Sequence, residues 1–577
     1  MSVRNQSRHL LVIGPVALFS VLAACAQAGP TPSPGDAERL TDRAASARTT
    51  MVLLAPIETS TLSRLQLFPG GGTAELLVLF NAGLTMADAD GGNRPYLAEQ
   101  IPQLNTESWT LGPDGKMETV FRLRANATWH DGTPLRASDF VFTWQVVSSP
   151  DLGLAGVPPQ RLMEEVSALD DRTLRIRWSQ PNPDVGRLDA GSRGLMFPPL
   201  PRHLLEAAYQ QGPDALRNHP FWTVDYVGVG PYRLDRWESG AFVEARAFEG
   251  HVLGRPKIER IKVLFVPDSS AVLAHLLAGE AHSPIDTALD LAQGLVLRDR
   301  WGDQGPGRVV FQAGTLRWTD VQHRPEYANP GAVLDVRVRR ALALAIDKPA
   351  MNEGLFASMG EPSHGFVRPT KPYFPAIEAA ITRYPFDLRR SEQLMNEAGF
   401  TKDRDGSYTQ PGGGPMSFEL ITNQGAESER ERSILAAGWR QAGFQIEEGV
   451  RRRGTDAEAR STYPSMSITA GFSGIDTVTR FTSATIPRAA NRWTGENTGG
   501  WSNADYDRAA AAVQSALDRD VRIQHLAETA RAMSEDLGAI VLHYSPKVYA
   551  FPTNLSGVKM PDPDEYVTWN IFEWELR

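Results

Sequence analysis

Cysteine is almost absent from this sequence, since Cys25 is the only cysteine in 577 residues. A chain with one cysteine forms no disulfide bond within itself, even in an oxidising compartment. After Cys25 the sequence also lacks an apolar run of the roughly 20 residues that a membrane-spanning helix needs. These two absences exclude a disulfide framework and a membrane-spanning segment after residue 25.

Motifs that indicate catalysis are missing as well. There is no HExxH, paired CxxC, GxxxxGK[ST] or Gly-x-Ser-x-Gly motif, and the 11 histidines do not cluster at metal-ligand spacing. Residues 70–73, Gly-Gly-Gly-Thr, could offer backbone N–H groups to an anion, but they lack the lysine of a phosphate loop, which favours a structural turn. His130-Asp131-Gly132 is also predicted to be a turn. The missing motifs disfavour an enzyme, and we expect no cofactor and no metal site.

The balance of charge is acidic, with 59 Lys and Arg residues against 68 Asp and Glu residues and a formal net charge of −9. Loss of Arg4 and Arg8 with an N-terminal signal would change the charge to −9 − 2 = −11. An acidic body argues against nucleic acid as a partner. The hydrophobic content of 42% is typical of a globular protein, and the length suffices for more than one domain.

The N-terminus has the pattern of an export signal. Two arginines precede an uncharged, mostly apolar stretch at residues 10–24, which suits a signal peptide and is short for a membrane span. The stretch ends in Leu22-Ala23-Ala24-Cys25, which looks like a lipobox. Residues 1–25 are therefore predicted to be a lipoprotein signal peptide with its lipobox, and Cys25 to carry the lipid anchor. The alternative is an ordinary secretory signal, which the position of the only cysteine disfavours.

A tether is predicted to follow the lipid anchor. Residues 26–49 contain several prolines and scattered charges but no apolar periodicity, so they cannot bury a core and should stay flexible. The folded body is predicted to span residues 50–577. The protein is expected to be extracytoplasmic and lipid-anchored to the membrane, on the cell surface or on the periplasmic side.

The body has the pattern of a mixed α and β protein. Apolar or alternating runs predict strands at 51–54, 119–124 and 174–178. Helical spacing predicts a helix at 137–147 with Ser138 or Asp139 as its cap. Other helices are predicted after the caps Asp335 and Asp387, at 434–442, and as two segments within 506–537, with ends at Gly399 and Gly443 and a strand at 444–446.

Six groups of short motifs then occur in an order typical of one family. They are 121–124 with 129–135 and 137–143; 228–232; 277–280; 335–342 with 345–347; 394–400; and 497–507. Together they resemble the ABC-transporter solute-binding proteins of extracellular family 5, the oligopeptide- and dipeptide-binding lipoprotein type. The resemblance covers most of the chain from about residue 53 to residue 549.

This resemblance implies an α/β fold: a two-lobed clamshell similar to periplasmic binding proteins (type II, cluster C) with an extra domain. Lobe I is expected at approximately 50–83, 201–314 and 543–577, the extra domain at 84–200, and lobe II at 315–542. The chain would cross between the lobes near Gly314-Thr315 and again near His543-Tyr544. A ligand would be enclosed between the lobes by a hinge motion.

The resemblance also implies a function. The protein would capture a peptide or other small solute and deliver it to an ABC permease in the cytoplasmic membrane, and it is expected to act as a monomer. Two alternatives stay open: a ligand-binding sensor or receptor lipoprotein without transport, and an exported enzyme on the same scaffold. The sequence does not identify the solute.

One family feature is missing. Peptide-binding members often hold the ligand's α-amino group with an aspartate, and Gly474 takes that position when Phe481 is aligned to the family phenylalanine. Asp476 would replace it only if the loop shifts. The residues predicted to bind the ligand are Glu58, Trp318, Asp476, Trp493, Asn497 and Trp501. Core packing is an equal alternative for each tryptophan, and loop capping for Asp476.

Overall fold

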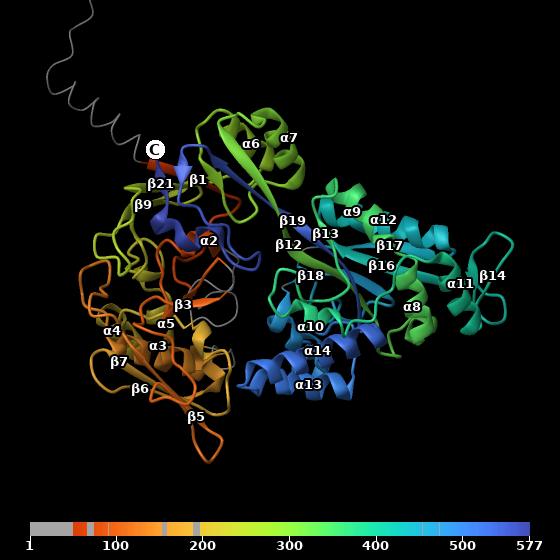
Figure 1. Ribbon diagram of the computed structural model, residues 1–577, viewed down its shortest axis with the longest axis horizontal. Coiled ribbons are helices and arrows are strands. Elements are labelled where there is room, and N and C mark those ends of the chain that lie inside the picture. Colours follow the sequence, from red (N-terminus) through yellow and green to blue (C-terminus); the bar gives the residue numbers. More distant parts are fainter. Residues whose placement is uncertain are drawn as a thin grey trace, which may run out of the picture. The chain divides into compact units, whose positions relative to one another are not determined.

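The computed structural model describes residues 50–65, 74–89, 92–152, 159–188, 197–452, 454–471 and 473–577 (Figure 1). The predictions for the signal peptide, Cys25, the tether and residues 70–73 therefore lie outside the described residues. Sheets of five, six and four strands form the framework of the described part, together with small two-stranded pairs. None of the described helices has both the length and the apolar character to cross a membrane.

The five-stranded sheet has the order β11-β1-β10-β9-β8. Strand β1 is buried on both faces, because Met51 and Leu53 pack into one apolar core while Leu54 packs into another. This explains why the run is continuously apolar, and it confirms the strand predicted at 51–54. The elements are β1 (Thr50–Ala55), β8 (Tyr232–Glu238), β9 (Phe242–Ala247), β10 (Arg260–Phe265) and β11 (Ser283–Pro284), with α6 (Ser269–Leu277) and α7 (Leu291–Trp301) nearby.

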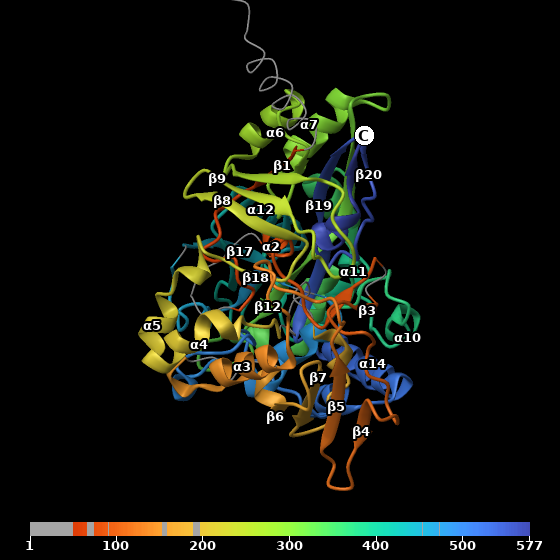
Figure 2. The same cartoon turned by 90° about the vertical axis from the view of Figure 1, so that its left-hand side faces the viewer.

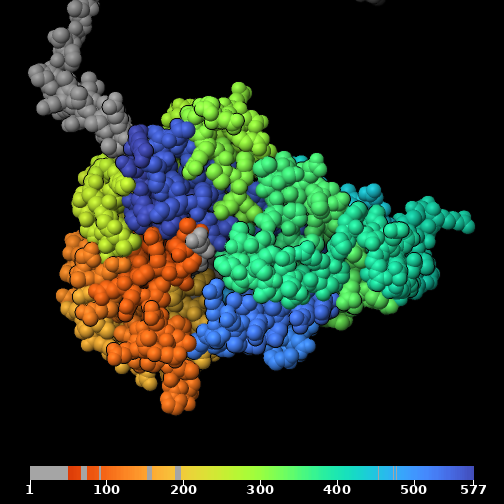
Figure 3. All heavy atoms as spheres, in the orientation of Figure 1, coloured from red at the N-terminus to blue at the C-terminus, as the bar shows by residue number. Residues whose placement is uncertain are grey.

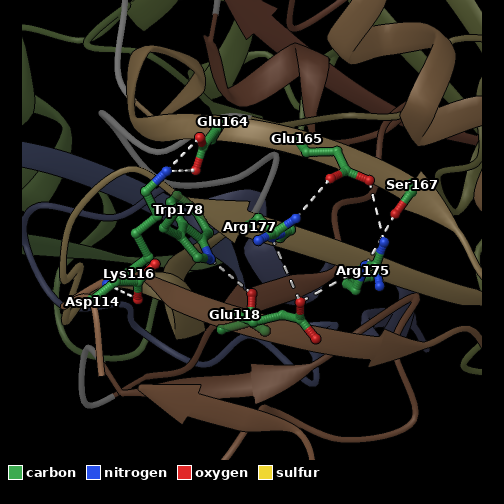
Figure 4. Close-up of polar contacts among 10 residues, drawn as sticks. Asp114, Lys116, Glu118, Glu164, Glu165, Ser167, Arg175, Arg177 and Trp178 are labelled. Carbon is green, nitrogen blue, oxygen red and sulfur yellow. Dashed lines mark hydrogen bonds and ion pairs between the residues drawn. The ribbon is translucent and has the colours of Figure 1, made fainter. Parts of the chain in front are cut away.

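The four-stranded sheet is antiparallel throughout, in the order β4-β5-β7-β6. Alternate side chains of its strands are charged and pair across the sheet: Arg175 and Arg177 both lie beside Glu118 and Glu165 (Figure 4). This alternation confirms the two predicted strands here, although the first ends at Arg122. The strands are β4 (Trp109–Leu111), β5 (Met117–Arg122), β6 (Met163–Ala168) and β7 (Thr173–Trp178).

Helix α3 (Ala137–Ser148) packs beside this sheet and begins after Arg136, so the predicted caps Ser138 and Asp139 are wrong in position. Asp139 acts from the first turn instead. Its Oδ2 accepts hydrogen bonds from the Arg136 backbone N–H at 2.9 Å and from Trp129 Nε1 at 3.2 Å. The aspartate is needed because the first N–H groups of a helix have no partner within it.

The six-stranded sheet has the order β13-β19-β12-β18-β16-β17, and its strands β16, β17 and β18 run parallel where they pair with one another. The predicted caps Asp335 and Asp387 are confirmed, since each accepts a hydrogen bond from the first turn of its helix. The strands are β12 (Gly307–Val321), β13 (Glu361–Pro362), β16 (Ser417–Asn423), β17 (Gln445–Arg451), β18 (Met466–Gly471) and β19 (Ala539–Pro552); the helices are α8 (Val336–Leu344), α9 (Lys348–Phe356), α11 (Leu388–Glu397), α12 (Ala426–Ala442), α13 (Ala504–Ser515) and α14 (Arg519–Asp536).

Strands β12 and β19 are the longest of the described strands and run side by side (Figures 1 and 2). Tyr549 and Phe551 of β19 belong to the same apolar core as β1, whereas Ile540 and Leu542 belong to the core of the six-stranded sheet. Their pairing is irregular between Ala313 and Leu316, which includes the predicted crossing at Gly314-Thr315.

Candidate functional site

A cavity of about 510 Å³ lies among four groups of segments that are distant in the sequence; we call it the central cavity. Figure 3 shows two of the neighbouring regions, orange and blue, side by side on the surface. The lining comes from residues 92–93 and 183–187, from 371–373, from 473–475 and helix α14, and from 564–565. A cavity of this size suits a small ligand.

One wall of the central cavity is fastened by an ion pair. Arg522 donates to both oxygens of Asp184, at 2.9 Å and 2.5 Å. Burial opposes ionisation of Asp184, but the hydrogen bond and the charge of Arg522 outweigh it and hold the pKa of that carboxyl below its ordinary value. Arg187 also lies 3.9 Å from Asp184, so two arginines share this carboxylate.

The base of the central cavity contains a second buried pair. Arg368, which is only 2% exposed, donates to Asp564 at 3.1 Å and to the carbonyl oxygen of Ala313 at 2.8 Å. Ser473 donates its hydroxyl to the same aspartate at 2.7 Å. Burial opposes ionisation of Asp564, but Arg368 and Ser473 keep its pKa low. The network joins the irregular part of β12 to the loop after β18.

Gly474 lies at the point where the family aspartate is expected, and it lines the central cavity. Its backbone has φ +77°, a conformation that favours glycine, and its N–H donates to the Phe366 carbonyl at 2.6 Å. Asp476 belongs to the short helix Gly474–Phe481, but its side chain lies outside the described part. Its ligand role stays a prediction.

A second cavity of about 290 Å³ is lined by three arginines, Arg451, Arg460 and Arg480; we call it the arginine pocket. Arg451 donates to Ser467 Oγ at 3.1 Å and comes from the end of β17. Arg480 stacks over the ring of Trp318 at 4.9 Å, and its Nε has no hydrogen-bond partner among the described residues. The neutral part of the lining is Asn423, Ala457, Ser461, Ser467, Thr469, Trp493, Gly495 and Thr498.

Positive charge is in excess in the arginine pocket. The one carboxylate in its described lining belongs to Glu496, which is 67% exposed and lies 3.9 Å from Arg480. In the described part of the chain, neither Arg451 nor Arg460 forms an ion pair. Burial lowers the pKa of Arg451, and the nearby carboxylates of Asp320 and Glu419 oppose that effect. Three guanidinium groups beside hydroxyl donors are a suitable environment for a carboxylate, phosphate or sulfate.

The predicted ligand residue Glu58 lies apart from both cavities. Its carboxylate accepts from Trp237 Nε1 at 2.7 Å and from the Gly240 backbone N–H at 2.9 Å, and so holds the β8–β9 hairpin. Trp493 lines the arginine pocket, with its backbone at φ +59°. Trp318 is fully buried beneath Arg480.

Asn497 and Trp501 are brought together inside the protein. The Asn497 amide donates to the carbonyl oxygens of Phe481 at 3.1 Å and Trp501 at 2.8 Å. Trp501 is 1% exposed and donates to Asp536 at 2.6 Å. These contacts are structural, and a ligand role for these residues stays a prediction. The arginine pocket was not predicted from the sequence. Of its three arginines, only Arg451 begins a local run of positive charge, Arg451-Arg452-Arg453.

Comparison with known proteins identifies the family of the chain. The model of the bacterial extracellular solute-binding proteins, family 5, matches residues 99–487, which is more than half of the chain. The chain therefore belongs to this family. Within the described residues, no group of three or more His, Cys, Asp or Glu side chains gathers as metal ligands.

The relatives in sequence are binding proteins. An ABC transporter peptide-binding protein of Brucella ovis is 24% identical over 300 residues, 51% of each chain. The chain thus spans about half the length of the first curated relatives it matches. The oligopeptide-binding protein AppA of Bacillus subtilis is 22% identical over 85% of each chain. The dipeptide-binding protein of Escherichia coli is 23% identical over 78% of this chain and 81% of the relative.

The fold matches solved structures more completely. NikA of Brucella suis, in complex with Fe(III)-EDTA, has a TM-score of 0.74 at 16% identity and covers 92% of this chain and 100% of its own. AppA of Bacillus subtilis, in complex with a nonapeptide, has a TM-score of 0.69 at 20% identity, with coverages of 92% and 99%. The predicted α/β fold of the two-lobed binding-protein type is confirmed.

Proposed function

We propose that this protein is an extracytoplasmic solute-binding lipoprotein that captures a peptide or other small solute and delivers it to an ABC importer. Membership of family 5 supports solute binding, and the names of the relatives support a transport role. The signal and Cys25 support a lipid anchor. Residues 50–83, 201–314 and 543–577 would form lobe I, 84–200 the extra domain, and 315–542 lobe II.

The arginine pocket carries a more specific proposal: the solute has an acidic group. Arg451, Arg460 and Arg480 bring three positive charges to one cavity, and its described lining has a single acid, Glu496. One further carboxylate, that of buried Asp320, lies behind Thr498 and leaves positive charge in excess. Confining like charges is unfavourable, and an anionic solute would relieve the repulsion. Bidentate hydrogen bonds from guanidinium to carboxylate or phosphate would add geometric selectivity.

The test uses paired ligands. Mass spectrometry identifies the solute that co-purifies with the protein, and calorimetry then compares short peptides and other small acids with their amides. An acid should bind at least about tenfold more tightly than its amide, because the amide lacks one charged hydrogen bond.

The matched variants are Arg451→Met in the pocket and Arg508→Met outside it. The Arg508 side chain is 75% exposed and forms a surface ion pair. Only the first should weaken acid binding. Equal binding of acids and amides would sink the acidic-solute proposal while leaving solute capture intact. Absence of any bound or bindable solute would count against solute capture itself.

A further inference from the structure

Lys348, the first residue of helix α9, is a buried cation with no acidic partner. Its Nζ donates to the Ser363 carbonyl oxygen at 2.7 Å and lies 3.3 Å from His364 Nδ1. Only 9% of the residue is exposed. Among the described residues, no Asp or Glu carboxylate forms an ion pair with it.

This arrangement is costly, because an ammonium group without a counter-charge loses its hydration without recovering the energy. Burial lowers the pKa of Lys348 to about 7. Burial, then the charge of Lys348, then that of Arg383, lower the pKa of His364 to about 4. The imidazole is therefore uncharged at neutral pH and supplies no negative charge to the lysine.

Lys348 and His364 border a cavity of about 50 Å³, which we call the lysine cavity. Its walls are otherwise mostly apolar and include Phe366, Phe481 and Met533. Because one water molecule needs about 10–15 Å³ on this measure, the space suits a group of about three to five heavy atoms. The cavity thus combines a short apolar slot with one unbalanced positive charge.

We propose that the lysine cavity binds a small monocarboxylate with a short apolar chain, its carboxylate against the Nζ of Lys348. The carboxylate supplies the counter-charge that the described residues lack, and the chain fills the apolar slot. This site is separate from the arginine pocket and goes beyond the proposed function. Gly474 and Leu526 line both the lysine cavity and the central cavity, so an occupant would contact the loop that lines the central cavity.

The charged form of Lys348 is the one that binds a carboxylate, so binding should weaken as the pH rises. The other titratable groups in the described walls are His364, Tyr384 and Tyr506, and Arg383 lies near the histidine. Burial raises the pKa of both tyrosines, while that of His364 is low, so none of the three changes charge between pH 6 and pH 8. The pH dependence in this window therefore reports on the lysine.

The experiment is calorimetry of the whole mature protein with sodium propionate, 1-propanol and sodium chloride at matched ionic strength. Propionate has five heavy atoms and should bind at least about tenfold more tightly than propanol. It should also bind about tenfold more tightly at pH 6 than at pH 8, as the charged fraction of a group of pKa about 7 dictates. Lys348→Met should abolish the preference for the acid. Lys257→Met, on an exposed ion pair, should retain it.

Three outcomes would overturn the proposal: propionate and propanol bind equally, Lys348→Met binds propionate as tightly as the wild type does, or propionate does not bind at all. A lysine that only holds the loop at Ser363 predicts a less stable variant and no effect of propionate on the wild type. Should Lys348→Met fail to fold, the propanol comparison and the pH dependence of the wild type still decide between the two.

Discussion

Arg522 and Asp184 form a two-pronged ion pair although 338 residues separate them in the sequence. The two side chains are 12% and 14% exposed, so the pair is largely shielded from water. It joins helix α14 to the segment that follows β7 at the wall of the central cavity. Removing Arg522 would leave Asp184 buried with only its longer contact to Arg187, at 3.9 Å.

Arg522→Met should lower the free energy of unfolding by about 3 kcal/mol, the usual cost of breaking a buried pair. Arg508→Met is the control, because its ion pair with Asp505 is exposed and should contribute less than about 1 kcal/mol. Urea unfolding measures both values. Equal small effects of the two substitutions would show that the buried pair is not important for stability.

Buried histidines predict a loss of stability in mild acid. Burial lowers the pKa of His130 to about 4, that of His251 to about 4 and that of His323 to about 3. Below about pH 6.5 the unfolded chain takes up protons that the folded protein excludes. Each histidine should then cost about 1.4 kcal/mol per pH unit until the pH reaches its folded pKa.

The histidines should therefore make the free energy of unfolding fall steeply from about pH 6.5 to about pH 4. Above pH 7 it should rise further with pH, because the folded protein holds the pKa of Lys348 at about 7 and the unfolded chain does not. His323→Gln should reduce the slope, whereas His525→Gln, on an exposed side chain, should leave it unchanged. A stability that stays level between pH 6.5 and pH 4 in the wild type would contradict the explanation.

His130 also shows why the scaffold could be predicted from the sequence. Its ring lies within 3.1 Å of the Gly228 N–H and of the Gly230 carbonyl oxygen, so two of the family motifs bind one another. A Cβ on either glycine would collide with the backbone at Phe80. Residues fixed by such close contacts recur in a family order, and apolar periodicity marks the strands and helices between them.

The cavities could not be predicted in the same way. Arg451 and Arg480 come from a strand end and from a short helix after another strand, and no local pattern shows that they line one pocket. Trp501 shows a second difficulty, although its ligand role stays a prediction. A tryptophan near a predicted ligand loop suggests stacking, but its environment is a core and its indole N–H is bonded to Asp536. Burial depends on contacts that the local sequence does not contain.

Anchoring by lipid predicts a simple fractionation result. Cys25→Ser removes the only thiol in the chain, so the variant protein should carry no lipid. Without the lipid, the variant should no longer be found in the membrane fraction. Labelled palmitate and fractionation of the cells measure both effects. Equal incorporation of label in the wild type and the variant would contradict the lipobox interpretation.

A clamshell mechanism predicts compaction. A solute that contacts both proposed lobes favours the closed state, so the radius of gyration should decrease when the solute saturates the protein. Small-angle X-ray scattering with and without the co-purified solute measures the change. A radius of gyration that stays constant at saturation would argue against closure by a hinge.

The last prediction rests on Gly474 and concerns the amino end of a ligand. The residue carries no charge where the family aspartate is expected. The neighbouring Ser473 contacts the carboxylate of Asp564, but that carboxylate already pairs with Arg368. An ammonium group brought to this position would lack a free counter-charge, which is strongly unfavourable. The protein should therefore not hold a free peptide amino terminus there.

Calorimetry with short peptides in free and N-acetylated forms tests this expectation, and acetylation should change the affinity by less than about twofold, because no charged hydrogen bond is lost. Clear binding of free peptides that is abolished both by acetylation and by Asp476→Asn would contradict it and establish Asp476 as a displaced anchor. Asp505→Asn, an exposed aspartate outside both cavities, is the matched control for the loss of one carboxylate. Loss of binding on acetylation without an effect of Asp476→Asn would direct attention to Asp564, because its carboxylate lies beside Ser473 at the cavity base.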